Sequence, residues 1–278
     1  MKRPPPVSFV LALRPRQWVK NVFVFAALVF AGRLSDLAAV LRVCGAFGVF
    51  CVLSSAVYLI NDVRDREADR RHPHKRRRPI AAGEISPGEA SAASVVLAVA
   101  ALFAAFRLSS GFGMVAAAYL VLNLGYSFGL KKVGTLDVMM VAAGFLLRAL
   151  AGALVIDVEI SRWLVLCTGL LALFLGFVKR RQEITALDGG AGTRPILKEY
   201  SLPFLDQMIA VVTGATVVAY SLYAFSPEVA QKLGTEHLGL TIPFVLFGIF
   251  RYLYLVHQRG VGENPTQVVM TDVPLILD

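Results

Sequence analysis

The chain has 278 residues, of which 56% are hydrophobic and only 17% charged, and its mean hydropathy is +0.65. Because soluble domains usually carry roughly 25% charged residues, this composition excludes an ordinary water-soluble domain and indicates a membrane protein. The formal net charge of +9 can be explained by membrane topology alone, so no nucleic-acid partner is expected.

Apolar runs long enough to cross a bilayer, for which about 20 residues are needed, recur along the chain. The sequence predicts an all-α polytopic transmembrane bundle that forms a single domain over residues 1–278. We expect eight spans, near residues 17–32, 38–60, 88–107, 111–129, 135–156, 162–179, 203–225 and 239–256. The first is the weakest, because it is short and begins among charged residues.

The N-terminal segment precedes this weakest span. Its short apolar run "VSFVLAL" is followed by "RPRQWVK" instead of a small-residue cleavage site, which predicts an interfacial segment and not a cleaved signal peptide. Arg16 and Lys20 stand one helical turn apart beside Asn21. Contact with lipid headgroups would explain them, with Trp18 as an interfacial anchor; binding of a substrate phosphate is the other interpretation.

The three cysteines are expected to have no redox or metal-binding role. Cys44, Cys51 and Cys167 all fall inside predicted spans. Cys44 and Cys51 would lie about 10 Å apart along one helix, which is too far for a disulfide. We expect all three to be packing residues.

The connection at 61–83, "NDVRDREADRRHPHKRRRPIAAG", carries four acidic and eight basic side chains. If the second span continues as a helix, steps of about 100° per residue place four of its oxygen-bearing side chains in one quadrant. Like charges so close require a counter-charge. These residues are Asn61, Asp62, Asp65 and Asp69.

Hard oxygen ligands on one helix face suit Mg²⁺, which takes one or two carboxylates and completes its shell with water and substrate phosphate. The pattern therefore predicts a Mg²⁺ site that holds a diphosphate, with Asp62, Asp65 and Asp69 as the catalytic carboxylates. A solvated network with the surrounding arginines is the alternative. Among the bases, Lys75 and Arg78 are candidates for phosphate binding, and part of the basic run is expected on any cytoplasmic loop.

The connection at 130–137 and the span after it offer further candidates, Tyr126, Lys131 and Arg148. On a helix, Asp137 and Arg148 share one face with Gly144 between them. A charge in mid-span costs ~2.5 kcal/mol or more. Arg148 should therefore face the bundle interior, paired with an acid or with a substrate anion.

The connection at 179–203 begins with "KRRQEITALD" and supplies Lys179, Arg180 and Glu183 as candidate phosphate-site residues. Downstream, Tyr200 and Asp206 could hydrogen-bond a sugar hydroxyl, although helix capping and packing would also explain them.

Lysine and arginine are distributed unevenly between the two sides of the membrane. With the N-terminus in the cytoplasm, 22 of the 28 fall in cytoplasmic segments, five fall on the opposite side, and Arg148 alone lies within a span. By the positive-inside rule, the N-terminus and the charged connections are expected to face the cytoplasm, in a multi-pass protein of the plasma membrane.

Four stretches, "LRPRQWVKN", "NDVRDREADRRHPHKRRRPIAAG", "LKKVGTLDVMMVAAGFLLRALAG" and "GFVKRRQEITALDGG…LKEYSLPFLDQM", together resemble the UbiA superfamily of membrane prenyltransferases. The resemblance implies a helical, Mg²⁺-dependent enzyme, typically with nine spans, whose active site is on the cytoplasmic side. Only "VPLIL" in the terminal "TDVPLILD" resembles the start of a ninth span. The resemblance also favours phosphate binding by Lys20 and Asn21.

Members that use a prenyl diphosphate carry a second D-x-x-x-D motif where this chain has "KRRQEITALD". The closer resemblance is to a branch that transfers 5-phosphoribosyl from phosphoribosyl diphosphate (PRPP) to a polyprenyl phosphate, expected to be decaprenyl phosphate. The product would be the precursor of the arabinose donor for cell-wall arabinan, and a homo-oligomer is compatible with the sequence. The alternatives are prenyl transfer to an aromatic acceptor and a transporter that uses Asp137 and Arg148, although no inverted repeat is visible.

Overall fold

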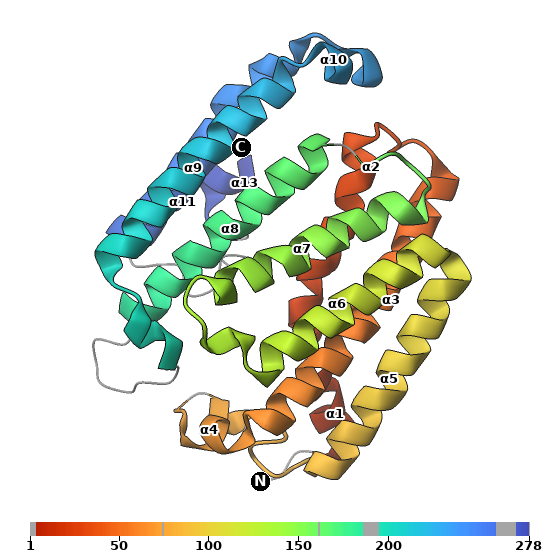
Figure 1. Cartoon of the computed structure of the whole chain (residues 1–278), viewed down its shortest axis with the longest axis vertical. Coiled ribbons are helices and arrows are strands. Elements are labelled where there is room, and N and C mark those ends of the chain that lie inside the picture. The colour runs from red at the N-terminus through yellow and green to blue at the C-terminus, as the bar shows by residue number, and fades with distance from the viewer. Residues whose placement is uncertain (1–3, 74, 161, 186–194, 260–270, 278) are drawn as a thin grey trace. The chain divides into compact units, whose positions relative to one another are not determined.

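The computed structural model describes residues 4–73, 75–160, 162–185, 195–259 and 271–277, and every regular element in these ranges is helical (Figure 1). The chain divides into two compact units. Unit 1 comprises residues 1–131 and 144–160, and unit 2 comprises residues 132–143 and 161–278.

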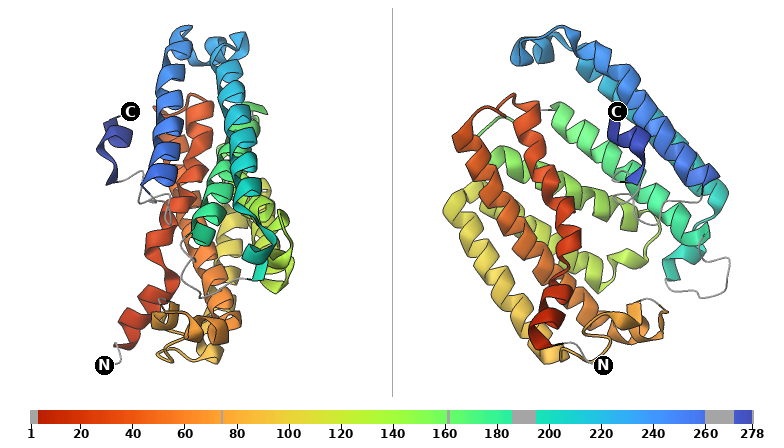
Figure 2. Two further views of the ribbon diagram at one scale, coloured as in Figure 1. Left: turned by 90° about the vertical axis from the view of Figure 1, so that its left-hand side faces the viewer. Right: turned by 180° about the vertical axis from the view of Figure 1, so that it is seen from behind.

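Unit 1 is built around the long helix α3, against which α5 runs along its length (Figures 1 and 2). Its elements are α1 (Pro5–Leu13), η1 (Pro15–Phe25), α2 (Ala26–Phe30), α3 (Leu37–Arg64), α4 (Arg66–Arg71), η2 (Lys75–Arg77), α5 (Pro87–Leu108) and α6 (Ser110–Phe128). The 3-10 turn η3 (Leu130–Lys132) and helix α7 (Leu136–Val155) each belong partly to unit 1 and partly to unit 2.

Polar caps fix where the long helices of unit 1 begin. Asp36 accepts a hydrogen bond from the backbone N–H of Ala39 at the start of α3, at 3.1 Å. Ser86 and Glu89 form a capping box at the start of α5, and Ser109 caps α6. Each cap satisfies backbone donors that the first turn of a helix leaves unpaired.

Small and aromatic side chains bring the helices of unit 1 close together. The ring of Phe50 on α3 packs edge-on against Phe112 and Tyr119 of α6, with centroids 5.9 and 5.2 Å away. Gly152 of α7 lies directly on η1, because a Cβ atom there would come within 1.9 Å of the carbonyl oxygen of Val24. The backbones of α7 and η1 are therefore in contact, which only glycine permits at this position.

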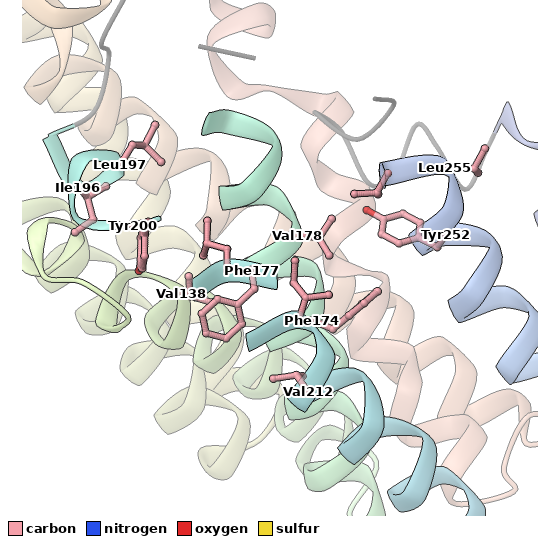
Figure 3. Packing of buried hydrophobic residues seen from close by; sticks show 13 residues of the cluster. Val138, Phe174, Phe177, Val178, Ile196, Leu197, Tyr200, Val212, Tyr252 and Leu255 are labelled. Atoms are coloured by element: carbon pink, nitrogen blue, oxygen red, sulfur yellow. The ribbon is translucent and has the colours of Figure 1, made fainter. Parts of the chain in front are cut away.

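Unit 2 contains α8 (Arg162–Thr185), η4 (Pro195–Glu199), α9 (Leu202–Ala224), α10 (Pro227–Leu233), η5 (His237–Thr241), α11 (Ile242–Gln258) and α13 (Val273–Leu277). In this unit α9 lies beside both α8 and α11, as Figures 1 and 2 show. Its buried core joins Phe174 and Phe177 of α8 to Val212 of α9, Tyr252 of α11 and Val138 of α7 (Figure 3).

The predicted helical membrane bundle is confirmed, with one correction to the spans. Seven helical segments of the described residues are long and apolar enough to cross a membrane, and each corresponds to a predicted span. The predicted span at 17–32 is instead the 3-10 helix η1 followed by α2, a helix of five residues. The short "VPLIL" helix is present as α13, and residues 260–270 before it lie outside the described part.

Candidate active site

The acidic pattern after α3 is spread over a turn. Helix α3 ends at Arg64, Asp65 has non-helical dihedral angles (φ −89°, ψ 5°), and α4 starts at Arg66. Figure 1 shows α4 set at an angle to the end of α3. The predicted placement of all the acidic residues on one continuous helix is therefore wrong, because the chain turns at Asp65 and Asp69 is carried on α4.

The turn nevertheless brings two carboxylates together. Nη1 of Arg78 donates to Oδ1 of Asp62 at 3.1 Å and to Oδ2 of Asp69 at 2.6 Å. The side chains of Asp62 and Asp69 are only 3% and 6% exposed. Two buried carboxylate oxygens thus converge on one cationic nitrogen, which supplies the counter-charge that such a pair requires.

Arg14 is a second counter-charge for Asp62, and sequence reasoning missed it. Its guanidinium forms an ion pair with Oδ1 of Asp62. Arg14 has a left-handed backbone (φ 55°, ψ 59°) between α1 and η1, immediately before a proline, where the right-handed helical conformation is disfavoured. The sequence pattern had favoured the neighbouring Arg16, whose side chain is exposed.

Asp65 and Asn61 have other partners. Nζ of Lys131 binds both carboxylate oxygens of Asp65, at 2.7 and 2.9 Å. The side-chain oxygen of Asn61 accepts a hydrogen bond from Ser127 on α6. The structure therefore separates a buried pair, Asp62 and Asp69, from the more exposed Asp65.

The carboxylates of Asp62 and Asp69 fit a Mg²⁺ ion that takes only one or two of its ligands from the protein. In the described ranges, no three His, Cys, Asp or Glu side chains gather closely enough to hold a metal by themselves. Mg²⁺, however, usually takes only one or two carboxylates and fills its shell with water and substrate phosphate. Asp62 and Asp69 already share one cation through Arg78, so they could share a metal ion if Arg78 moved away.

A second polar cluster surrounds Arg148 on α7. This side chain is 5% exposed, as predicted for a residue that faces the interior. It donates from Nε to Oδ1 of Asn21 at 2.8 Å, from Nη1 to the carbonyl oxygen of Gly144 at 2.8 Å, and from Nη2 to the hydroxyl of Tyr119 at 2.7 Å. All three acceptors are neutral, so the predicted acid partner is not found among the residues that the structure describes.

Lys20 and Asn21 of η1 lie beside this arginine. Asn21 is fully buried, and its amide nitrogen donates to Sγ of Cys51 and Oγ of Ser54 on α3. Lys20 precedes Asn21 in η1, and the positive charges of Arg148 and Arg14 act unfavourably on its ammonium group. Asn21 therefore orients Arg148, and Lys20 adds a second cation to the cluster.

In unit 2, Asp137 is the buried centre of a hydrogen-bonded network. It accepts from Nε of Arg180 at 2.5 Å and from the hydroxyl of Tyr200. That hydroxyl in turn accepts from the backbone N–H of Thr135 at 2.6 Å. Burial, and then the hydrogen bond to Asp137, raise the pKa of Tyr200 above its ordinary value, so its hydroxyl stays protonated and keeps donating.

The remaining predicted residues occupy both units. Arg180 also pairs with Glu183 at 2.6 Å, and Asp206 pairs with Arg181. Three further candidates, Lys75 in η2, Tyr126 near the end of α6 and Lys179 in α8, are half-buried.

Comparisons with known proteins agree with the helical architecture. The UbiA prenyltransferase family model matches residues 21–266. The chain is 38% identical to decaprenyl-phosphate phosphoribosyltransferase of Mycolicibacterium smegmatis, over 95% of this chain and 86% of that protein. It is 37% identical to the protein of the same name from Corynebacterium glutamicum, over 98% of this chain and 84% of that protein.

Among solved structures, the chain is similar to a UbiA homologue from Archaeoglobus fulgidus bound to GPP and Mg²⁺. The TM-score is 0.72 at 19% identity, and the match covers 97% of this chain and 93% of that one. This likeness supports the fold. With the family match over most of its length and these relatives, the chain belongs to the UbiA prenyltransferase family.

Proposed function

We propose that this protein transfers a 5-phosphoribosyl group from PRPP to the phosphate of a polyprenyl phosphate and releases diphosphate. Decaprenyl phosphate is the expected lipid. The two bacterial relatives that carry the name decaprenyl-phosphate phosphoribosyltransferase are similar over nearly the whole chain, which supports this class of reaction.

The observation that carries the proposal is the convergence of Asp62 and Asp69 on a single cationic nitrogen. Asn61 and Asp65 stand at the end of α3 with their own partners, Ser127 and Lys131, and we propose that they complete the Mg²⁺ site around this pair. When bound there, Mg²⁺ would neutralise the charge that collects on a departing diphosphate.

The protein's own residues would bind and orient the two substrates. Arg78 and Arg14 form ion pairs with Asp62 in this structure. Their planar guanidinium groups match the oxygens of a phosphate as well as those of a carboxylate. Besides Arg14, the residues that we propose for substrate binding are those predicted from the sequence: Arg16, Lys20, Asn21, Lys75, Arg78, Tyr126, Lys131, Arg148, Lys179, Arg180, Glu183, Tyr200 and Asp206. In this set Asn21 and Tyr200 are positioning residues, because their polar atoms hold Arg148 and Asp137.

The bond changes need no dedicated general base. The bond between the anomeric carbon and the diphosphate breaks, and its electron pair leaves with the diphosphate oxygen. An oxygen of the lipid phosphate forms the new bond from the opposite face. Because a phosphate monoester is already ionised near pH 7, with a second pKa of about 6, no side chain has to remove its proton.

The basic residues at the start of the connection at 179–203 support a phosphoribosyl donor over a prenyl diphosphate. Lys179, Arg180 and Arg181 lie in the last turns of α8, where the family resemblance would place a second aspartate cluster in a prenyl-transferring enzyme. Arg180 is held in place by Asp137 and Glu183. Such fixed cations suit a substrate with an additional phosphate.

An extraction assay tests this function. Membranes containing the protein would be incubated with labelled PRPP, polyprenyl phosphate and Mg²⁺, and lipid-soluble label would be measured. We expect label to enter the lipid phase, and we expect Asp62→Asn to reduce the rate at least 100-fold because the metal-binding pair is lost. No lipid-soluble label, together with product formation from a prenyl diphosphate and an aromatic acid, would overturn the proposal.

A further inference from the structure

The hydroxyl of Ser127, near the end of α6, faces two oxygen atoms but carries one proton. Its Oγ atom lies 2.6 Å from the backbone carbonyl oxygen of Asn123, one turn earlier on α6, and beside Oδ1 of Asn61 at the end of α3. Ser127 is only 2% exposed. Because a serine hydroxyl donates one hydrogen bond and both neighbouring oxygen atoms are acceptors, Ser127 can serve only one of them at a time.

Asn61 presents to Ser127 the end of its amide that competes for this proton. The carbonyl oxygen of Asn123 is the acceptor that a helical serine commonly uses, since it belongs to the residue four positions earlier. The amide of Asn61 also carries two N–H groups, and within the described ranges no acceptor is found for its nitrogen. The donor end of this side chain is therefore unused, although a hydroxyl oxygen lies beside it.

Rotation of the Asn61 side chain about its last bond exchanges the two ends of the amide. An N–H group of Asn61 then donates to Oγ of Ser127, and Ser127 keeps its own proton for Asn123, so that each hydrogen bond has one donor and one acceptor. The amide oxygen of Asn61 leaves Ser127 and becomes available to another partner. More hydrogen bonds are therefore satisfied in the turned amide as soon as its oxygen has that partner.

Two contacts hold the end of α3 in register with the segment that joins α6 to η3. Ser127 contacts Asn61, and Lys131, four residues later, binds Asp65, which follows Asn61 by four residues. Ser127 is itself bound to the α6 backbone through Asn123. It is therefore a rigid support for Asn61, because moving its hydroxyl away would require α6 to shift.

We propose that Ser127 is a positioning residue of the acidic site: its hydroxyl holds the amide nitrogen of Asn61, so that the amide oxygen is offered to Mg²⁺. The inference rests on the proposed function, which places Asn61 among the Mg²⁺ ligands, and it adds a residue of α6 that does not touch the metal itself. Amide oxygens are hard ligands that suit Mg²⁺. Outer-shell hydrogen bonds that orient metal ligands typically change metal affinity about 10–100-fold.

The metal affinity of the purified full chain in detergent tests this role without turnover. Mn²⁺, which takes the same carboxylate and carbonyl ligands as Mg²⁺, serves as the probe, and its free concentration is read from the electron paramagnetic resonance signal of the aqueous ion. Wild type should bind Mn²⁺, and excess Mg²⁺ should displace it. Ser127→Ala should weaken Mn²⁺ binding about tenfold or more, because the amide of Asn61 then loses the group that orients it.

Three further variants separate the orientation of Asn61 from a general loss of stability. Ser127→Thr keeps the hydroxyl and should bind Mn²⁺ within about threefold of wild type, less than the loss expected for a missing outer-shell partner. Ser127→Cys keeps the shape of serine with a much weaker hydrogen-bonding group, and it should show the loss even if Ser127→Ala does not fold. Ser94→Ala on α5 is the matched control, because Ser94 is also buried and donates to a backbone carbonyl, that of Ala56, at 2.8 Å. Its Mn²⁺ affinity should be unaltered.

A double variant tests whether Ser127 acts through Asn61. Asn61→Ala should itself weaken Mn²⁺ binding, and adding Ser127→Ala should then change the affinity by less than about twofold, because the ligand that Ser127 orients is gone. The inference is overturned if Ser127→Ala binds Mn²⁺ as tightly as wild type, or if its loss persists in the Asn61→Ala background. Either result would leave the proposed phosphoribosyl transfer intact, whereas no Mn²⁺ binding by wild type would remove the Mg²⁺ site and this inference with it.

Discussion

At the scale of single residues, Arg78 is the side chain on which the acidic site most depends. One of its nitrogens binds both buried carboxylates, and its own side chain is 29% exposed. A divalent cation at Asp62 and Asp69 would need the same two oxygens. Arg78 and the metal ion are therefore expected to compete, and the arginine stabilises the pair when no metal ion is present.

Arg78→Gln should lower the thermal stability of the protein in EDTA, because it removes a charged partner from two buried carboxylates. The loss should be about 1.5–3 kcal/mol, as for a hydrogen bond to a charged group, and Mg²⁺ should restore part of it. Thermal unfolding in detergent measures both effects. Arg77→Gln is the matched control, since Arg77 is exposed and has no ion pair within the described ranges. Equal losses in the two variants, or no recovery with Mg²⁺, would contradict this role.

Tyr200→Phe removes the hydroxyl that joins Asp137 to the backbone of Thr135. Thr135 has a left-handed backbone (φ 61°), so this hydrogen bond also holds a strained residue before α7. The variant should be less stable than wild type by roughly 1–2 kcal/mol.

The pH dependence of that difference follows from the raised pKa of Tyr200. The pKa of tyrosine in the unfolded chain is near 10. When the folded-state pKa is higher, the tyrosine makes its full contribution to stability at any pH below the unfolded-state value. Its contribution is lost as the pH rises through the folded-state value. Denaturant melts of wild type and Tyr200→Phe should differ by a constant amount up to about pH 9, and the gap should narrow above pH 10. If the stability difference between wild type and Tyr200→Phe changed between pH 6 and 9, a group other than Tyr200 would be responsible for it.

At the scale of helices, the contact between α7 and η1 places Arg148 beside Asn21 and Lys20. Gly152→Ala would put a methyl group against the carbonyl oxygen of Val24, so the helices would have to separate. We expect the free energy of unfolding to fall by about 1–3 kcal/mol, as for overpacking in a dense core, and substrate binding to weaken because Arg148 is displaced. Gly48→Ala on α3 is the control, because a Cβ there meets nothing within 4 Å. Similar unfolding temperatures for the two variants would refute the contact.

The long helices could be predicted from the sequence because apolar runs end at polar caps. The predicted start at 88 and the observed start at Pro87 differ by one residue, and Ser86 with Glu89 marks the boundary. Segment 17–32 could not be predicted in the same way. Length and hydropathy do not distinguish an α-helix from the 3-10 helix that follows the left-handed Arg14 and Pro15.

The types of residue in the candidate site were predictable, and their pairings were not. The acidic cluster indicated that Asp62 and Asp69 need a counter-charge, although the continuous helix assumed for their spacing is interrupted at Asp65. Burial of Arg148 followed from the cost of a charge in a span. That Asp62 is bound by Arg14 and not Arg16 depends on the turn between α1 and η1. No periodic pattern carries that information, because it arises from contacts between distant segments.

At the scale of the whole molecule, the distribution of lysine and arginine predicts which side of the membrane carries the chemistry. In a chain whose native cysteines are replaced by serine, Arg76→Cys should be protected from a membrane-impermeant maleimide in intact cells. Lys232→Cys should react under the same conditions. Both positions are exposed, so accessibility within the protein does not limit either reaction. The reverse labelling pattern would contradict the cytoplasmic assignment of the acidic site.

The central claim is that the sugar phosphate, and not a prenyl group or a diphosphate, moves to the acceptor. PRPP that carries one label in the ribose carbons and another in the terminal phosphorus of its diphosphate tests this directly. With polyprenyl phosphate and Mg²⁺, we predict that the ribose label enters the lipid phase and that the terminal phosphorus label stays in water as diphosphate. Terminal phosphorus label in the lipid, or no ribose transfer by protein that is folded and inserted in the membrane, would contradict the account.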